Sequence, residues 1–176
     1  MRQQIVQKGY ETLHKRAHPV EIEDIQSDHI QSVIQDMKDS LAGEPDGVAI
    51  AAPQIGIDLQ IFVVRGSVYG DGESDVAYIN PEIIKTSSKV EPMDEGCLSV
   101  RYYYGKVERH KNVTIEAYGE SGEKMQRGAG GLLAHIFQHE IDHLHGILFV
   151  DKAIQCEEMS EEEKKTLDEK REHAKQ

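Results

Sequence analysis

Two histidines four residues apart constrain this chain more than any other feature. They are His139 and His143, and Glu140 directly follows the first of them. Each residue of an α-helix turns by about 100°, so the two imidazoles lie about 40° apart on one face and can bind the same metal ion. Glu140 lies about 100° to the side of His139, where a carboxylate can move protons for a water activated by that ion. The pattern is typical of metal-dependent hydrolases.

The segment around these histidines predicts a buried helix. Residues 131–137 are almost all apolar, and Gly146 offers a natural end to the helix. A single histidine in such a helix would most simply be a hydrogen-bonded core residue. Two histidines with the H-E-x-x-H spacing instead favour a metal site.

The third ligand would decide the class of metal enzyme. A metzincin protease would have a histidine where this chain has Phe149. Another type of zincin would recruit a downstream glutamate, but the candidates lie in a polar, solvated tail: Glu157, Glu158, Glu161, Glu162 and Glu163. His135 precedes His139 by one turn and His145 is near the helix end, yet three histidines at i, i+4 and i+8 span about 12 Å, more than one ion can bridge.

The chain has two cysteines, Cys97 and Cys156. Its first residues contain no apolar leader and no run of 18 apolar residues occurs, so we expect neither a membrane segment nor a disulfide framework. Cys97 follows Gly96, which allows close backbone approach and makes this thiol the better candidate for the third ligand. Taken alone, Cys97 is more simply interpreted as a buried structural cysteine. We interpret Cys156 as structural.

Three segments together resemble the motifs of the peptide deformylase family. They are GVAIAAPQIG at residues 47–56, EGCLS at residues 95–99 and QHEIDHL at residues 138–144. Their order and approximate spacing match the family, and residues 78–84 and 113–117 are similar to its strands. The resemblance covers nearly the whole chain, most weakly at residues 1–20 and after Asp151.

The resemblance implies a metal centre and its catalytic groups. Cys97, His139 and His143 would hold one divalent ion, with Fe2+ usual in the family and Zn2+, Ni2+ or Co2+ suited to the same ligands. Glu140 would be the general base. The side-chain amide of Gln54 and the backbone N–H of Leu98 would stabilise the charge that develops on the formyl oxygen.

The resemblance also implies the substrate, which is the N-formyl group on the initiator methionine of a nascent polypeptide. Hydrolysis would release formate and a free amine. The peptide would lie as an added strand beside Gly47, Val48, Ala49 and Ile50. The other expected substrate-binding residues are Glu95, Gly96, Leu132 and Ile136, of which the last two are equally well explained as core residues. The nascent chain is the expected partner, with the ribosome near its exit tunnel as a further one.

Two positions depart from the family pattern. Ala49 stands where the family commonly has glycine, so its methyl group is expected to narrow the cleft and alter rate or specificity. The family often has proline after Ser99 and Val100, where this chain has Arg101 followed by three tyrosines at 102–104, and this rim is expected to bind a different stretch of peptide.

Two alternatives remain open. A zincin-type metalloprotease shares the two-histidine helix, and a non-catalytic protein of the same fold would bind peptide N-termini without turnover. The length of 176 residues predicts one catalytic domain over residues 1–176. The net charge of −12 argues against a nucleic-acid-binding surface and favours a cytoplasmic protein.

Apolar spacing predicts an α+β fold in which mostly antiparallel strands wrap around the central metal-binding helix. A first helix is predicted after Ser27 and before Gly43, because apolar residues recur there at helical spacing. Strands are predicted at residues 59–65, 76–80, 83–86 and 112–117. A C-terminal helix is predicted from Ser160 to about Lys175, with acidic residues in its first turn.

Overall fold

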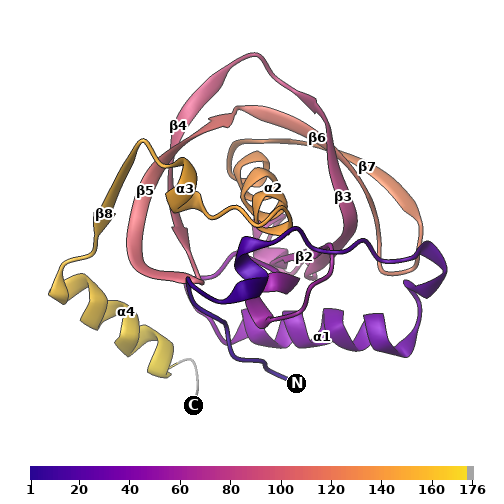
Figure 1. Cartoon of the computed structure of the whole chain (residues 1–176), viewed down its shortest axis with the longest axis horizontal. Helices are drawn as coiled ribbons and strands as arrows, with labels where there is room; N and C mark the ends of the chain where they lie inside the picture. Colours follow the sequence, from indigo (N-terminus) through magenta and orange to yellow (C-terminus); the bar gives the residue numbers. More distant parts are fainter. Residues whose placement is uncertain (174–176) are drawn as a thin grey trace.

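The structure, a computed structural model, describes residues 1–173 and contains two antiparallel sheets around a central helix (Figure 1). The larger sheet has the strand order β1 (Ala49–Ala51), β2 (Ile61–Val64), β3 (Val76–Thr86), β6 (Asn112–Tyr118) and β7 (Lys124–Gly130). The smaller sheet has the order β4 (Val90–Cys97), β5 (Val100–His110) and β8 (Gln155–Glu158). The α-helices are α1 (Asp28–Ala42), α2 (Gly131–Leu144), α3 (Phe149–Lys152) and α4 (Glu161–His173). The predicted α+β class is confirmed.

The core lies on both faces of the larger sheet. Because successive strand residues point to opposite faces, Ile61 and Val63 of β2 pack towards α1, whereas Phe62 and Val64 pack towards α2. Short 3-10 turns connect these layers at Glu11–His14, Ile22–Asp24, Ala52–Ile55 and Gly66–Val68.

The first predicted helix is confirmed as α1. The Ser27 hydroxyl accepts a hydrogen bond from the backbone N–H of Ile30 at its N-terminus, and Gly43 follows its last residue. The apolar positions that predicted the helix are buried in the cluster beneath the larger sheet.

The central helix α2 ends as predicted near Gly146. That glycine has a φ of +74°, and a Cβ there would lie 2.6 Å from the backbone nitrogen of Lys15. Glycine is therefore required both by the backbone conformation and by the close passage of the N-terminal segment.

Two predicted strands, residues 76–80 and 83–86, are a single strand. Strand β3 continues through Pro81, with register irregularities after Ile79 and Ile83. Asn80 adopts a left-handed φ of +51°, and its side chain hydrogen-bonds the backbone N–H and C=O of Val20. These hydrogen bonds stabilise a kink in β3, at the position where the sequence predicted the end of one strand and the start of the next.

Strands β4, β5, β7 and β8 were not predicted. Their sequences are rich in charged residues and glycine, and much of β4, β7 and β8 is exposed, so apolar alternation is weak. Pairing with neighbouring strands, which no local pattern reveals, fixes these segments as strands.

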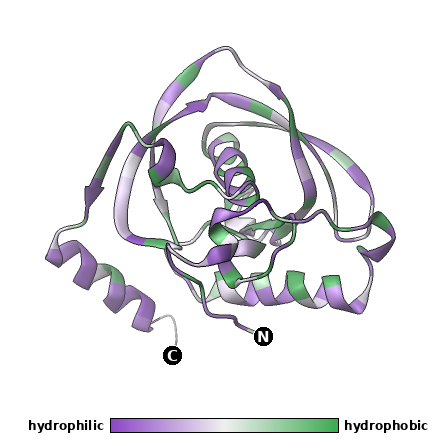
Figure 2. Ribbon diagram, in the orientation of Figure 1, coloured by the Kyte–Doolittle hydropathy of each residue, from purple (hydrophilic) through white to green (hydrophobic). Residues whose placement is uncertain are grey.

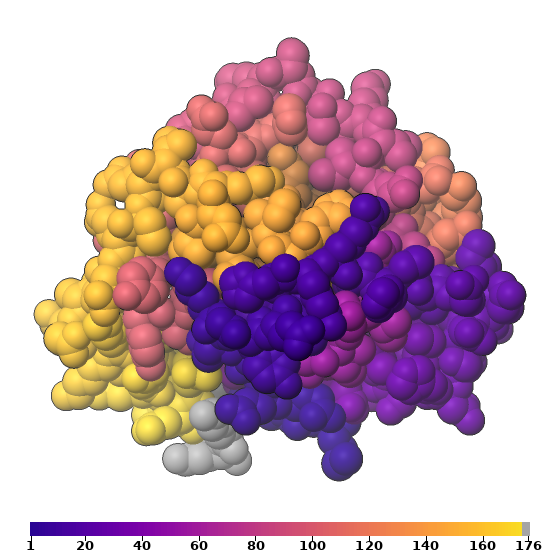
Figure 3. All heavy atoms as spheres, viewed as in Figure 1, coloured from indigo at the N-terminus to yellow at the C-terminus, as the bar shows by residue number. Residues whose placement is uncertain are grey.

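The C-terminal helix α4 begins as predicted after Ser160, whose hydroxyl accepts a hydrogen bond from the Glu163 backbone N–H. Its predicted end at Lys175 lies outside the described residues. Figure 3 shows this segment against the β5 side of the molecule, while the N-terminal arm crosses the front. Within residues 1–173, no helix has the length and apolar character needed to cross a bilayer.

Candidate metal centre and cleft

Helix α2 and the end of strand β4 bring three metal-binding side chains together. One potential ligand atom from each of Cys97, His139 and His143 lies within 4.8 Å of the others. The Nε2 atom of His143 is 3.2 Å from the Cys97 sulfur. Ligands of a tetrahedral ion with bond lengths of about 2.0–2.3 Å lie roughly 3.3–3.6 Å apart, so this spacing suits a single ion. The structure therefore has a candidate Cys/His/His metal site.

Glu95 orients one of the two histidines. Its Oε2 atom accepts a hydrogen bond from Nδ1 of His139 at 2.8 Å, which leaves Nε2 of that ring available as a ligand atom. The other carboxylate oxygen of Glu95, Oε1, lies 2.8 Å from Nε2 of His135. The sequence suggested Glu95 as a substrate contact. It does line the cleft, but its carboxylate is held by these two histidines.

Arg109 completes the support behind Glu95, and sequence reasoning missed it. Its Nε lies 2.6 Å from Glu95, and its Nη1 lies 2.6 Å from Asp142, which also binds Lys152. Arg109 is buried because it follows Gly105 and Val107 on the inward positions of β5. Had β5 been recognised, an arginine on its inward face would have indicated a buried carboxylate partner.

The Cys97 thiol and the His139 imidazole shift each other's pKa. Burial alone would raise the pKa of the Cys97 thiol, but the neighbouring His143 and His139 outweigh burial and lower the pKa to about 5. Burial likewise would lower the pKa of His139, yet Cys97 and Glu95 raise that pKa well above its ordinary value. A thiolate is thus available as a metal ligand near neutral pH.

Glu140 is buried beside the candidate metal site. Burial raises the pKa of its carboxyl group, opposed by the charges of His139 and His143. Its Oε2 atom is buried and has no hydrogen-bond partner among residues 1–173. A buried carboxylate oxygen without a partner is costly. A water held at the adjacent ion would satisfy it, so the residues present fit a metal centre.

Gln54 and Leu98 lie at the same site. The Gln54 side chain is fixed because its Oε1 accepts the Ala51 backbone N–H at 2.8 Å. Its amide nitrogen is 3.5 Å from the Cys97 sulfur and 3.2 Å from the Ser99 hydroxyl. Leu98 is buried and lines the cleft two residues before Val100. Both positions can present hydrogen-bond donors near the candidate metal ligands.

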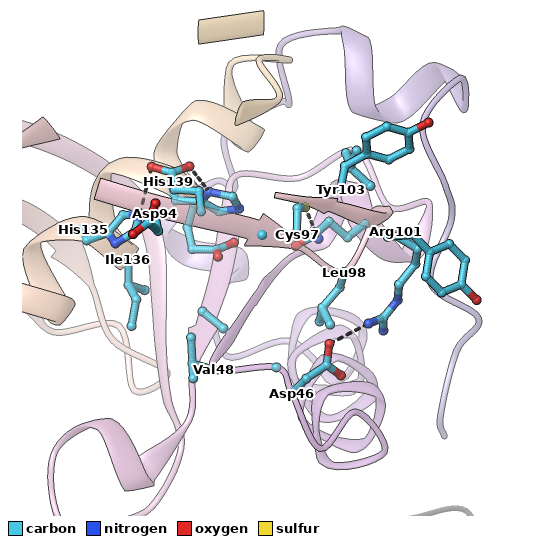
Figure 4. Close-up of a pocket in the computed structure, with 18 of the residues that line it drawn as sticks. Asp46, Val48, Asp94, Cys97, Leu98, Arg101, Tyr103, His135, Ile136 and His139 are labelled. Atoms are coloured by element: carbon cyan, nitrogen blue, oxygen red, sulfur yellow. Dashed lines mark hydrogen bonds and ion pairs between the residues drawn. The ribbon is translucent and has the colours of Figure 1, made fainter. Parts of the chain in front are cut away.

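The cleft has a volume of about 270 Å³ and is shown in Figure 4. It is lined by seven of the eight residues proposed from sequence as substrate contacts: Gly47, Val48, Ala49, Glu95, Gly96, Leu132 and Ile136. The eighth, Ile50, differs. Its side chain is fully buried on the α1 face of the sheet, because alternation along β1 turns it away from the cleft.

The alternative ligands considered from sequence lie elsewhere. Phe149 is buried in an apolar cluster with Leu13 and Val107. The five glutamates of the tail are exposed. Cys156 is exposed on β8 and does not belong to the candidate metal site.

Comparisons with known proteins identify relatives of this chain. A family model described as polypeptide deformylase matches residues 2–159. The chain is 45% identical over 141 residues to peptide deformylase 2 of Clostridium acetobutylicum, covering 80% of this chain and 88% of that protein. It is 41% identical over 157 residues to peptide deformylase 2 of Clostridium perfringens, covering 89% and 96%.

A solved structure shows the same fold. The crystal structure of a peptide deformylase from Legionella pneumophila superimposes with a TM-score of 0.79 at 34% identity, covering 99% of this chain and 96% of that chain. Neither a metalloprotease nor a non-catalytic binding protein is favoured by these matches. The chain belongs to the polypeptide deformylase family, the metal-dependent hydrolases that remove the N-formyl group from nascent polypeptides.

Proposed function

We propose that this chain removes the formyl group through one Fe2+ ion held by Cys97, His139 and His143. The proposal rests on the convergence of these three ligand atoms within 4.8 Å beside the buried, unpartnered Oε2 of Glu140. When bound, a divalent ion supplies a Lewis acid that makes water nucleophilic near neutral pH. One thiolate and two imidazoles also suit Zn2+, Ni2+ or Co2+, so the choice of Fe2+ follows the family.

Individual residues of the chain would transfer the proton, stabilise the developing charge and orient the ligands. Glu140 accepts a proton from the attacking water and passes it to the departing amine, a role that its raised pKa supports. The amide of Gln54 and the backbone N–H of Leu98 donate hydrogen bonds to the formyl oxygen as it gains negative charge. Glu95 holds His139 in the tautomer that leaves Nε2 free.

The peptide would extend along the free edge of β1. Among residues 1–173, strand β1 pairs with β2 on one side only, so its other edge can accept an added strand. Val48 and Ala49 would face the substrate from this edge, and Leu132 and Ile136 would enclose the methionine side chain. Ile50 would contribute its backbone alone. An Acinetobacter baumannii peptide deformylase whose structure is described as bound to Met-Ala-Ser matches this chain with a TM-score of 0.78 at 34% identity, covering 86% of this chain and 98% of that chain, which supports a short methionyl peptide as the ligand.

Residues 1–176 are proposed to form one catalytic domain that acts in the cytoplasm on nascent chains near the ribosomal exit tunnel. The support is the family's action on nascent polypeptides. Co-sedimentation with ribosomes carrying formyl-methionyl nascent chains tests the association.

The central experiment is turnover of formyl-Met-Ala-Ser by protein prepared without oxygen, with metal content measured on the same sample. We expect release of one formate per peptide and about one iron per chain. Formate release that persists after the metal is removed by chelation would contradict the proposal. Cleavage of the Met-Ala bond instead of formate release would identify a protease.

A further inference from the structure

Helix α4 contributes to the catalytic cleft although it lies beyond residue 159, where the family match ends. Met159 and Leu167 both line the cleft together with Tyr103. Leu167 is the single apolar side chain between Glu161 and His173, and Figure 2 shows the helix as almost entirely hydrophilic. The one apolar side chain of α4 therefore faces the cleft that holds the candidate metal site.

Polar contacts hold α4 in this position, because it has no apolar face to bury. The Tyr102 hydroxyl donates to the carboxylate of Asp168 at 3.0 Å. The Arg171 Nε lies 2.8 Å from the carboxylate of Glu44, which is buried after the end of α1. The same carboxylate binds Arg101 at 2.6 Å.

These contacts explain the unusual rim of the cleft. Arg101 stands where the family often has proline, and Arg101 and the adjacent Tyr102 secure α4. Strand β8 reinforces the arrangement by pairing Glu158 with Tyr103, and the Met159 backbone N–H donates to the Tyr102 carbonyl at 2.7 Å. The rim residues Arg101 and Tyr102 and the C-terminal helix α4 are thus joined, Tyr102 by direct contact and Arg101 through Glu44.

We propose that Leu167, with Met159 and Tyr103, forms an apolar subsite for a substrate side chain that follows the formyl-methionine. Tyr103 adjoins Tyr104, which pairs directly with Gly96 beside Cys97. An extended peptide advances about 3.3 Å per residue, so the second or third residue of the substrate reaches this part of the cleft. An apolar side chain there removes Leu167 and Met159 from water, whereas a small polar one does not.

The inference rests on the proposed function and is tested with a peptide panel. Formyl-Met-Ala-Ala is compared with peptides carrying leucine or serine at the second or the third position, and each rate is divided by that of formyl-methionine amide. We expect wild type to prefer leucine at one of these positions by about tenfold in kcat/KM, the lower end of discrimination by an apolar pocket. Leu167→Ser should reduce the preference to about twofold or less.

Two further variants distinguish the subsite from a general effect on the helix. Lys165→Ser makes a polar substitution on the opposite side of α4, outside the cleft, and should keep the full preference. Arg171→Gln weakens the attachment to Glu44 without changing a cleft residue and should reduce the preference as Leu167→Ser does. If the preference for leucine survives Leu167→Ser, or if wild type shows no such preference, the proposed subsite is refuted while the proposed function remains intact. No turnover of formyl-methionine amide by iron-loaded wild type would instead overturn the proposed function and the subsite with it.

Discussion

At the scale of single residues, Cys97 is a candidate metal ligand and Cys156 is exposed on a sheet edge. We predict that Cys97→Ala loses tight metal binding, because two imidazoles alone leave the coordination shell incomplete. Elemental analysis after dialysis measures the metal content. Cys156→Ala is the matched control and should retain both metal and activity. Full metal occupancy in Cys97→Ala would refute the ligand assignment.

Glu140 is predicted to act on protons and not as a ligand. Glu140→Gln keeps the size of the side chain but cannot carry the proton, so we expect metal to be retained and kcat to fall by about 10² or more. Steady-state kinetics with formyl-Met-Ala-Ser, paired with metal analysis, measures both effects. Unchanged turnover would remove Glu140 from the mechanism, and lost metal would make it a ligand.

Ala49 was expected to narrow the cleft, and the structure adds a second consequence. Its side chain lines the cleft but is also buried against the α2 side of the larger sheet. Ala49→Gly should therefore raise kcat/KM for formyl-methionyl peptides if the methyl group crowds them, and should cost about 1 kcal/mol of unfolding free energy in either case. Kinetics and denaturant unfolding of the same preparation separate these effects. A loss of stability without a kinetic gain would show that Ala49 does not restrict the substrate.

At the scale of elements, the attachment of α4 depends on one buried carboxylate. Burial would raise the pKa of Glu44, but its contacts with Arg171, Arg101 and Arg2 outweigh burial and lower the pKa below its ordinary value of 4.5. A carboxyl group with a lowered folded-state pKa stabilises the fold above its unfolded pKa, and this stabilisation is lost as the pH falls through the folded value.

We therefore predict a pH-dependent cost for Glu44→Gln. At pH 7 the substitution should cost about 2–3 kcal/mol of unfolding free energy, less than for a fully buried pair because Arg2 and Arg171 are partly exposed. The difference from wild type should shrink as the pH falls below 4.5. Denaturant unfolding between pH 3 and pH 7 measures it. A difference that stays constant over this range would show that the charge of Glu44 is not involved.

At the scale of the whole molecule, the candidate metal site connects the smaller sheet to the central helix. Cys97 ends β4, while His139 and His143 belong to α2. An ion bound only by the folded chain stabilises it by about 2.7 kcal/mol at a free concentration of 100 times Kd. For a domain of this length such a change raises Tm by roughly 5–10 °C.

Removal of the metal should accordingly lower Tm. We expect chelated wild type to melt roughly 5–10 °C below the iron-loaded protein, and His143→Ala to melt at the same temperature with or without iron. Thermal unfolding without oxygen measures both. Equal melting temperatures for loaded and chelated wild type would mean that the ion does not connect the two elements.

The sequence by itself determined the helices α1 and α2, and it brought Cys97, His139 and His143 forward as candidate ligands, a role that remains a prediction. This was possible because helical periodicity and the H-E-x-x-H spacing are local, and because the family motifs name the third ligand. The tertiary structure alone decided that Arg109 and His135 hold Glu95, that charged segments pair as β4 and β5, and that Leu167 faces the cleft. Those features depend on contacts between segments far apart in the chain. The residues that make these contacts follow no repeating pattern along the sequence, so the sequence alone does not predict them.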